Sequence, residues 1–350
     1  MRIVIHIGLH KTASTYLQHH IFPHLDEDRV VFNPHDLFYF INSIFTLDLK
    51  DDGRIAQARE LARQYRSRSE GKTLLISSEA ISQLSFTQNY GEHLKILGEI
   101  FEDAEIVLFL REQAAWFESC YKESIKHHFY QDAAAFLNYD GTAFRAEDAR
   151  LNAVGFFSMD VHKADWSRLV EMSKSLFPKT HIFFYEEFRR DNLGETNRLL
   201  AILGHPPLSH VPQALSNPGL SSPSTRTLIK YHALLRAFGI RKRTYMDTFL
   251  RERKAVLQHD YFWTPGKPFW LQRLLRNLYK EPLRLLHRVS IYTVLRWLDR
   301  RHPERRKRKA LSADMTGGIR SVHAASNSRL ETVIGRAPPA NYLAASPTTR

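Results

Sequence analysis

The chain has few of the features that would place it outside the cell or within a membrane. It contains one cysteine, Cys120, in 350 residues, so it cannot form an internal disulfide, which suits a reducing compartment. No run of eighteen apolar residues is present, and a membrane-spanning helix is therefore not expected. No basic, signal-like segment precedes the first apolar run. These absences predict a cytoplasmic protein.

Recognisable metal-binding patterns are also absent from the sequence. No acidic pair is placed for magnesium, and no group of Cys and His residues has the spacing of a zinc site. Two adjacent histidine pairs occur, His19-His20 and His127-His128. Neighbouring residues on a helix point in different directions, so these histidines are expected to be surface or partly buried side chains. The sequence predicts no metal cofactor.

The chain does contain enough apolar residues for a full globular core, because 43% of it is hydrophobic and 12% is aromatic. Short apolar runs predict strands, and longer amphipathic segments predict helices between them. The expected strands cover residues 2–7, 73–77, 105–110 and 181–185, and the expected helices cover 54–69, 89–101, 161–176 and 195–203. This alternation predicts an α/β fold with a central parallel sheet flanked by helices.

The first apolar run ends at Gly8 and is followed by a loop and a helix start. Gly8 permits a sharp turn, and Thr12, Ser14 and Thr15 offer hydroxyl and backbone N–H groups. Lys11 adds a positive charge where a helix N-terminus already favours anions. The segment therefore predicts a phosphate or sulfate site.

This loop is not the Walker A loop of nucleotide-binding proteins. That motif needs a glycine, four residues, and then Gly-Lys followed by Ser or Thr. Counted from Gly8, the Gly-Lys positions hold Ala13 and Ser14, and the lysine comes only three residues after the glycine. The loop is shorter and its charge is differently placed.

Residues 8–15 instead resemble the bacterial 5′-phosphosulfate loop of the sulfotransferases, enzymes that use 3′-phosphoadenosine 5′-phosphosulfate (PAPS). Ala13 stands where that family often has glycine. Because alanine resists the left-handed region, this replacement requires a negative φ at Ala13. A second match follows the strand at 105–110, where Arg111 precedes Ser119 by eight residues. In the family this arginine and serine grip the 3′-phosphate of PAPS. The planar fork of an arginine also suits phosphate on physical grounds, and a serine two turns into the next helix lies on about the same face.

The resemblance implies a three-layer, P-loop-like fold with PAPS as the sulfuryl donor and no metal. It implies that Lys11 stabilises the leaving nucleotide. The donor contacts that it implies are His10, Lys11, Thr12, Ala13, Ser14, Thr15, Tyr16, Arg111 and Ser119.

Glu79 follows the strand at 73–77 and is the candidate general base. The carboxyl ends of parallel strands meet at one edge of a sheet, so Lys11, Glu79 and Arg111 are expected to lie around one crevice. Glu79 resembles the glutamate bases of glycan sulfotransferases and would take the proton of an acceptor hydroxyl. The cytosolic small-molecule branch uses histidine, and His10 is the reserve candidate. The alternative for Glu79 is a carboxylate that caps a helix or orders the loop.

Charge divides the chain into three parts. Residues 1–225, the predicted sulfotransferase domain, hold 23 Lys and Arg against 29 Asp and Glu. Residues 226–309 hold 23 against 6 and predict a basic, aromatic and leucine-rich helical extension. Residues 310–350 are rich in Ala, Ser, Thr, Gly and Pro, and predict a disordered tail.

The basic extension could lie on an anionic membrane, which would place the protein peripherally at the inner membrane surface. Helices that pack on the core with solvated basic faces are the alternative. The extension has charge but no recognisable nucleic-acid-binding motif, so no specific recognition of nucleic acid is expected.

The preferred acceptor is a free hydroxyl on a saccharide or glycolipid, and the intervening loops, especially 130–155, are expected to shape its site. Two other functions remain open. One is a P-loop kinase that uses ATP, and the other is a membrane-associated scaffold without catalysis. The sequence does not indicate an oligomeric state.

Overall fold

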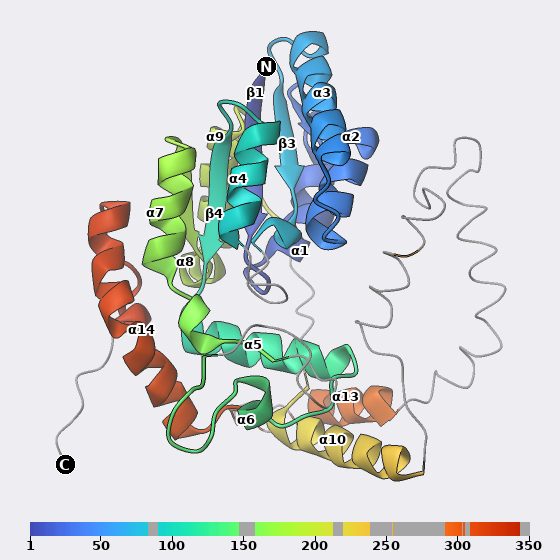
Figure 1. Ribbon diagram of the computed structural model, residues 1–350, viewed down its shortest axis with the longest axis vertical. Coiled ribbons are helices and arrows are strands. Elements are labelled where there is room, and N and C mark those ends of the chain that lie inside the picture. The colour runs from blue at the N-terminus through green and yellow to red at the C-terminus, as the bar shows by residue number, and fades with distance from the viewer. Residues whose placement is uncertain are drawn as a thin grey trace.

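The computed structural model describes residues 1–82, 90–146, 158–212, 220–238, 254, 291–302, 304 and 309–343. Part of the predicted acceptor loop, residues 147–157, lies outside the described residues, as do most of the predicted basic extension and the end of the predicted tail. The remaining chain forms a sheet covered by helices, with a further group of helices beyond one edge of the sheet (Figure 1).

Five parallel strands form the central sheet in the order β2-β3-β1-β4-β5. Strands β3 and β4 are buried along their whole length, as expected for near-continuous apolar runs in a parallel sheet covered on both faces. The strands are β1 (Arg2–Gly8), β2 (Val30–Phe32), β3 (Thr73–Ser77), β4 (Glu105–Leu110) and β5 (Thr180–Phe184).

The alternation of side chains along β1 builds one apolar core on each face of the sheet. Ile3, Ile5 and Ile7 join a large cluster with α2 (His35–Ile41), α3 (Asp52–Arg68), α4 (Tyr90–Ile100), α5 (Gln113–Lys126) and α7 (Trp166–Leu176). Val4 joins the opposite cluster with α1 (Ser14–Tyr16), the π-helix η1 (Leu17–Ile21), α8 (Tyr185–Arg190) and α9 (Asn192–Ile202). The predicted α/β class, with a central parallel sheet flanked by helices, is confirmed.

Short elements connect these layers. The α-helix α6 (Ala133–Phe136) follows α5, and η3 (Asn42–Thr46) is a turn of π-helix after α2. The 3₁₀ turns are η2 (Phe22–His24), η4 (Glu79–Ile81), η5 (Val161–Lys163) and η7 (Ala340–Tyr342).

Two helices from the basic part of the chain pack beside α5 (Figure 1). They are α10 (Ser222–Ala237) and α13 (Ile291–Arg301), and the predicted domain boundary at residue 225 falls inside α10. Asp299 of α13 is buried and accepts hydrogen bonds from the Ser221 amide at 2.6 Å and the Ser224 hydroxyl at 2.7 Å. This carboxylate caps α10 and joins the two helices.

The prediction of a disordered tail over 310–350 is wrong for most of that segment. Residues Ala313–Ile334 form α14, which starts at the cap Ser312, ends at Gly335 and packs against α5 and α7. Its buried positions are Ile319, His323, Asn327 and Leu330. Only two of these are apolar, so the hydrophobic pattern of the sequence does not show the helical period. Hydrogen-bonded polar side chains replace part of the apolar packing. Asn327, for example, exchanges hydrogen bonds with Gln113 at 2.7 and 3.0 Å.

Candidate active site

The loop after β1 is built on a close approach that only glycine permits. A Cβ atom on Gly8 would lie 1.8 Å from the Ser14 hydroxyl oxygen, far inside van der Waals contact. The chain turns back within six residues, so the first residue of α1 lies directly against the end of β1. Helix N-termini have amide groups without partners inside the helix, and this turn presents them at the sheet edge.

Two residues of the loop that are not glycine adopt left-handed backbone conformations. Lys11 has φ 68° and Ala13 has φ 75°. The expectation of a negative φ at Ala13 is therefore wrong. The conformation is imposed by its surroundings, because the Ala13 carbonyl accepts the amides of Tyr16 and Leu17 and the Thr12 hydroxyl donates to the Leu9 carbonyl at 2.5 Å.

Replacing Ala13 by glycine should stabilise the protein. An L residue in this region costs about 1–2 kcal/mol, and glycine avoids most of that cost although it gains freedom in the unfolded chain. We expect the free energy of unfolding to rise by about 1 kcal/mol, measured by urea denaturation. The matched control is Ala115→Gly, within helix α5, which should lower stability by a similar amount. A decrease for Ala13→Gly would contradict the strained conformation.

The ends of three adjacent strands bring the predicted site residues together. Strands β3, β1 and β4 are neighbours in the sheet, and Glu79, Lys11 and Arg111 follow their carboxyl ends. The Arg111 guanidinium donates to the Lys11 carbonyl oxygen at 2.8 Å. The Trp116 indole donates to the His10 carbonyl oxygen at 2.6 Å. The two segments matched in the sequence are thus in direct contact across β1 and β4.

Arg111 is held in place but keeps part of its hydrogen-bonding capacity. Its carbonyl accepts the Trp166 indole N–H at 2.7 Å, and its guanidinium lies 4.5 Å from the centre of the Tyr185 ring. The buried Arg111 Nε and the buried Ser14 hydroxyl are among the side-chain atoms that have no hydrogen-bond partner within the described residues. Buried polar groups are normally paired, so two unsatisfied donors beside a lysine fit an anionic ligand.

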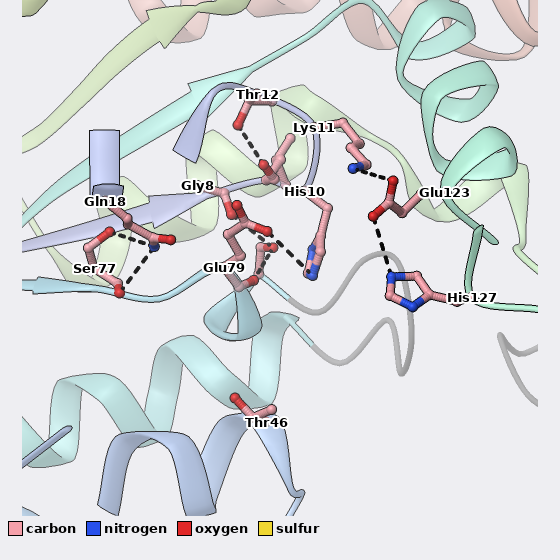
Figure 2. Close-up of polar contacts among 12 residues, drawn as sticks. Gly8, His10, Lys11, Thr12, Gln18, Thr46, Ser77, Glu79, Glu123 and His127 are labelled. Atoms are coloured by element: carbon pink, nitrogen blue, oxygen red, sulfur yellow. Dashed lines mark hydrogen bonds and ion pairs between the residues drawn. The ribbon is translucent and has the colours of Figure 1, made fainter. Parts of the chain in front are cut away.

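Glu79 and His10, the two candidate bases, lie close to each other. Glu79 opens the 3₁₀ turn η4, and its carboxylate oxygen Oε2 lies 3.8 Å from His10 Nε2 (Figure 2). Burial lowers the pKa of His10, while the negative charge of Glu79 opposes that shift. Both side chains are half-buried at the sheet edge. Either group could accept a proton from a bound hydroxyl, and the carboxylate could also polarise the imidazole.

The sequence reasoning missed Glu123 and His127, which lie beside Lys11. The Lys11 ammonium is 2.9 Å from Glu123 Oε2, and His127 Nε2 is 3.4 Å from Glu123 Oε1 (Figure 2). Partial burial opposes ionisation, but the hydrogen bond with His127 and the positive charge of Lys11 lower the pKa of Glu123 well below its usual range. The sequence shows that Ser119 and Glu123 lie four residues apart on one face of α5 and that the C-cap His127 continues this spacing, but it does not show that they meet Lys11.

The other predicted donor contacts differ in how far their side chains are available. The Thr12 hydroxyl is engaged by the Leu9 carbonyl, and the Tyr16 hydroxyl donates to the Pro212 carbonyl at 2.8 Å. Thr15 is exposed, and Ser119 is half-buried on α5 two turns after Arg111. The side chains of Thr12 and Tyr16 therefore stabilise the loop. In this structure only their backbone groups are available to a ligand.

Within the described ranges, no three or more His, Cys, Asp or Glu side chains gather as they would to hold a metal ion. In the same part of the chain, every helix is too short or too polar to cross a membrane. Burial raises the pKa of the Cys120 thiol to about 12, so this side chain is a packing group rather than a nucleophile.

Comparison with known proteins found similarity only at the level of structure. No protein-family model matches the chain, and no curated protein matches it. The structure is similar to the sulfotransferase of Alicyclobacillus acidocaldarius, with 15% identity, a TM-score of 0.40, and coverage of 74% of this chain and 96% of that one. It is also similar to the sulfotransferase domain of the Synechococcus PCC 7002 olefin synthase, with 12% identity, a TM-score of 0.35, and coverage of 74% and 94%.

Proposed function

We propose that this protein is a PAPS-dependent sulfotransferase that transfers a sulfuryl group to a hydroxyl of a saccharide or glycolipid. One observation carries the proposal. The lysine loop after β1 and Arg111 after β4 touch through the hydrogen bond from Arg111 to the Lys11 carbonyl. Two anion-binding elements at adjacent strand ends suit a ligand with two separate anionic groups, such as the 3′-phosphate and 5′-phosphosulfate of PAPS.

The residues of the loop would hold the phosphosulfate end of the donor. The amides at the start of α1, the Ser14 hydroxyl and the Lys11 ammonium are the groups available there. Arg111 and Ser119 would hold the 3′-phosphate, with the Tyr185 ring supporting the guanidinium. When bound, PAPS supplies the sulfuryl group and leaves as adenosine 3′,5′-bisphosphate.

Lys11 and Glu79 would do the chemistry on the protein side. Lys11 would exchange the carboxylate of Glu123 for the donor, and its charge would stabilise the negative charge that develops on the leaving nucleotide. Glu79, on the other side of His10, would remove the acceptor proton. Holding donor and acceptor in line supplies the remaining acceleration.

The position of α13 bears on the glycolipid option for the acceptor. The side chain of Tyr292, near the start of this helix, is partly buried against the core. Burial raises the pKa of its hydroxyl, and the charges of Arg296, Glu123 and Lys11 also act on it. A helix of the basic extension therefore lies close enough to Lys11 and Glu123 for their charges to act on Tyr292.

Ligand binding distinguishes this function from the two alternatives. A sulfotransferase should bind adenosine 3′,5′-bisphosphate in the presence of EDTA, as measured by calorimetry. A kinase should require ATP with magnesium, and a scaffold should bind neither. Transfer of label from PAPS to saccharides, glycolipids and phenols would then identify the acceptor, and label on a phenol alone would contradict the saccharide preference.

Arg111→Ala should weaken binding of adenosine 3′,5′-bisphosphate by about 10- to 100-fold, because a charged hydrogen bond contributes about 1.5–3 kcal/mol. The matched control is Arg63→Ala, an exposed arginine on α3 whose loss should leave affinity within about twofold. Equal affinity of the Arg111 variant and the wild type would remove the basis of the proposal.

A further inference from the structure

Exposed apolar side chains on the described surface are concentrated on α10 and α13. Five of the eight large hydrophobic side chains that are exposed there belong to these two helices. They are Tyr231 and Leu234 on α10, Phe238 at its C-cap, and Val294 and Trp297 on α13. Phe238 is 74% exposed and Leu234 is 58% exposed, so neither is a partly covered core residue. The two helices pack against each other and lie side by side in Figure 1.

Each set of side chains forms one stripe along its helix. Residues 231, 234 and 238 are spaced by three and four positions, and so are 294, 297 and 301, which places each set on one face. The opposite faces are buried. Leu228 and His232 of α10 pack inward, with His232 stacked on the Tyr130 ring at 3.6 Å, and Leu295 of α13 is 5% exposed. The rest of the protein therefore holds this surface in a fixed orientation.

The exposed charge on the two helices is of one sign. Exposed basic residues flank them at Arg226, Lys230, Arg236, Arg300 and Arg301. Helix α10 has no acidic residue, and the only one in α13, Asp299, is 1% exposed and is bound by serines. The Arg301 guanidinium lies 4.1 Å from the centre of the Trp297 ring, so an aromatic anchor and a cation are presented together.

We propose that the α10–α13 face, defined by these exposed apolar and basic side chains, binds an anionic lipid bilayer. Leu, Phe and Trp side chains can enter the boundary between headgroups and acyl chains while Lys and Arg contact anionic headgroups. Nucleic acid would satisfy the cations but would leave the aliphatic side chains in water. Lipid binding at this face does not depend on the residues of the proposed sulfuryl-transfer site.

Vesicle flotation of the full-length protein tests this face. The wild type should float with vesicles of phosphatidylcholine and phosphatidylglycerol, and much less with phosphatidylcholine alone. The triple variant Leu234→Ser, Phe238→Ser and Trp297→Ser should reduce partitioning at least about tenfold, since three apolar anchors are lost. Its control, Leu176→Ser, Val322→Ser and Leu343→Ser, removes three exposed apolar side chains from other surfaces and should float like the wild type.

The charge contribution is tested separately. Arg300→Gln with Arg301→Gln should lower partitioning by about 25-fold, or about fivefold for each cation removed near the surface. Arg63→Gln with Arg68→Gln on α3 is the control and should have little effect. The inference is overturned if the wild type fails to float, or if the control variants lose as much binding as the α10–α13 variants. Retention of a short RNA or DNA duplex without any vesicle binding would also overturn it.

Discussion

Glu79→Gln is expected to lower kcat by about two to four orders of magnitude, the range typical for loss of a general base. Glutamine keeps the size and the hydrogen-bonding ability of the side chain but cannot accept the proton of the acceptor. Affinity for adenosine 3′,5′-bisphosphate should stay within a few-fold of the wild type, because the loop and Arg111 are left in place. The measurement is initial-rate sulfuryl transfer from PAPS together with calorimetry of the product nucleotide.

Two variants separate the roles of the neighbouring groups. His10→Gln removes the imidazole that lies 3.8 Å from the Glu79 carboxylate and should reduce kcat much less than Glu79→Gln. The exposed Glu70→Gln variant is a charge-matched control and should transfer at the wild-type rate. If Glu79→Gln turns over normally while His10→Gln does not, the base is His10. Glu79 is then a carboxylate that orders the loop, the alternative that the sequence left open.

Lys11→Met should lower kcat by about 10²- to 10³-fold, comparable to the loss of one preorganised donor at a site of developing charge. Methionine retains most of the length of the side chain and leaves the left-handed backbone requirement at this position unchanged. The rate of a single turnover with saturating PAPS is the appropriate measurement, because it isolates the transfer step from product release.

The control for the Lys11 variant is a substitution of Lys126, which pairs with the same Glu123 carboxylate. Lys126 Nζ lies 3.0 Å from Glu123 Oε1, and Lys126 is exposed. Lys126→Met therefore removes a cation from Glu123 without touching the loop, and its turnover should remain within about twofold of the wild type, as for an exposed ion pair. A similar loss in both variants would mean that Lys11 acts only by neutralising Glu123.

Local sequence patterns predicted four of the five strands because apolar runs carry their own signal, whereas the short strand β2 was not predicted. The strands at 73–77 and 105–110 are continuous apolar runs, and they coincide with β3 and β4. Helix α14 was not predicted from its hydrophobic pattern, because His323 and Asn327 occupy half of its buried positions. Its stability comes from partners far away in the chain, such as Gln113, which no local window contains.

Some features of the candidate site could likewise be predicted from the sequence, and others could not. The positions of Lys11, Glu79 and Arg111 after strands could be recognised in the sequence, since the carboxyl ends of parallel strands share an edge. The pairing of Lys11 with Glu123 could not, because these residues are separated by more than a hundred positions and meet only after α5 docks. The left-handed conformation of Ala13 was also unpredicted, because alanine adopts it only where surrounding hydrogen bonds compel it.

By itself, the sequence determined the fold class and the positions of the proposed anion-binding loop and of the arginine that follows β4, because each depends on a short pattern of residue types. Only the tertiary structure decided that Glu79 and His10 lie together, that Glu123 and His127 flank Lys11, and that α10 and α13 turn their apolar and basic residues outward. These features depend on long-range packing, which sets which faces of the helices are covered and which side chains from distant segments come within a few ångströms of one another.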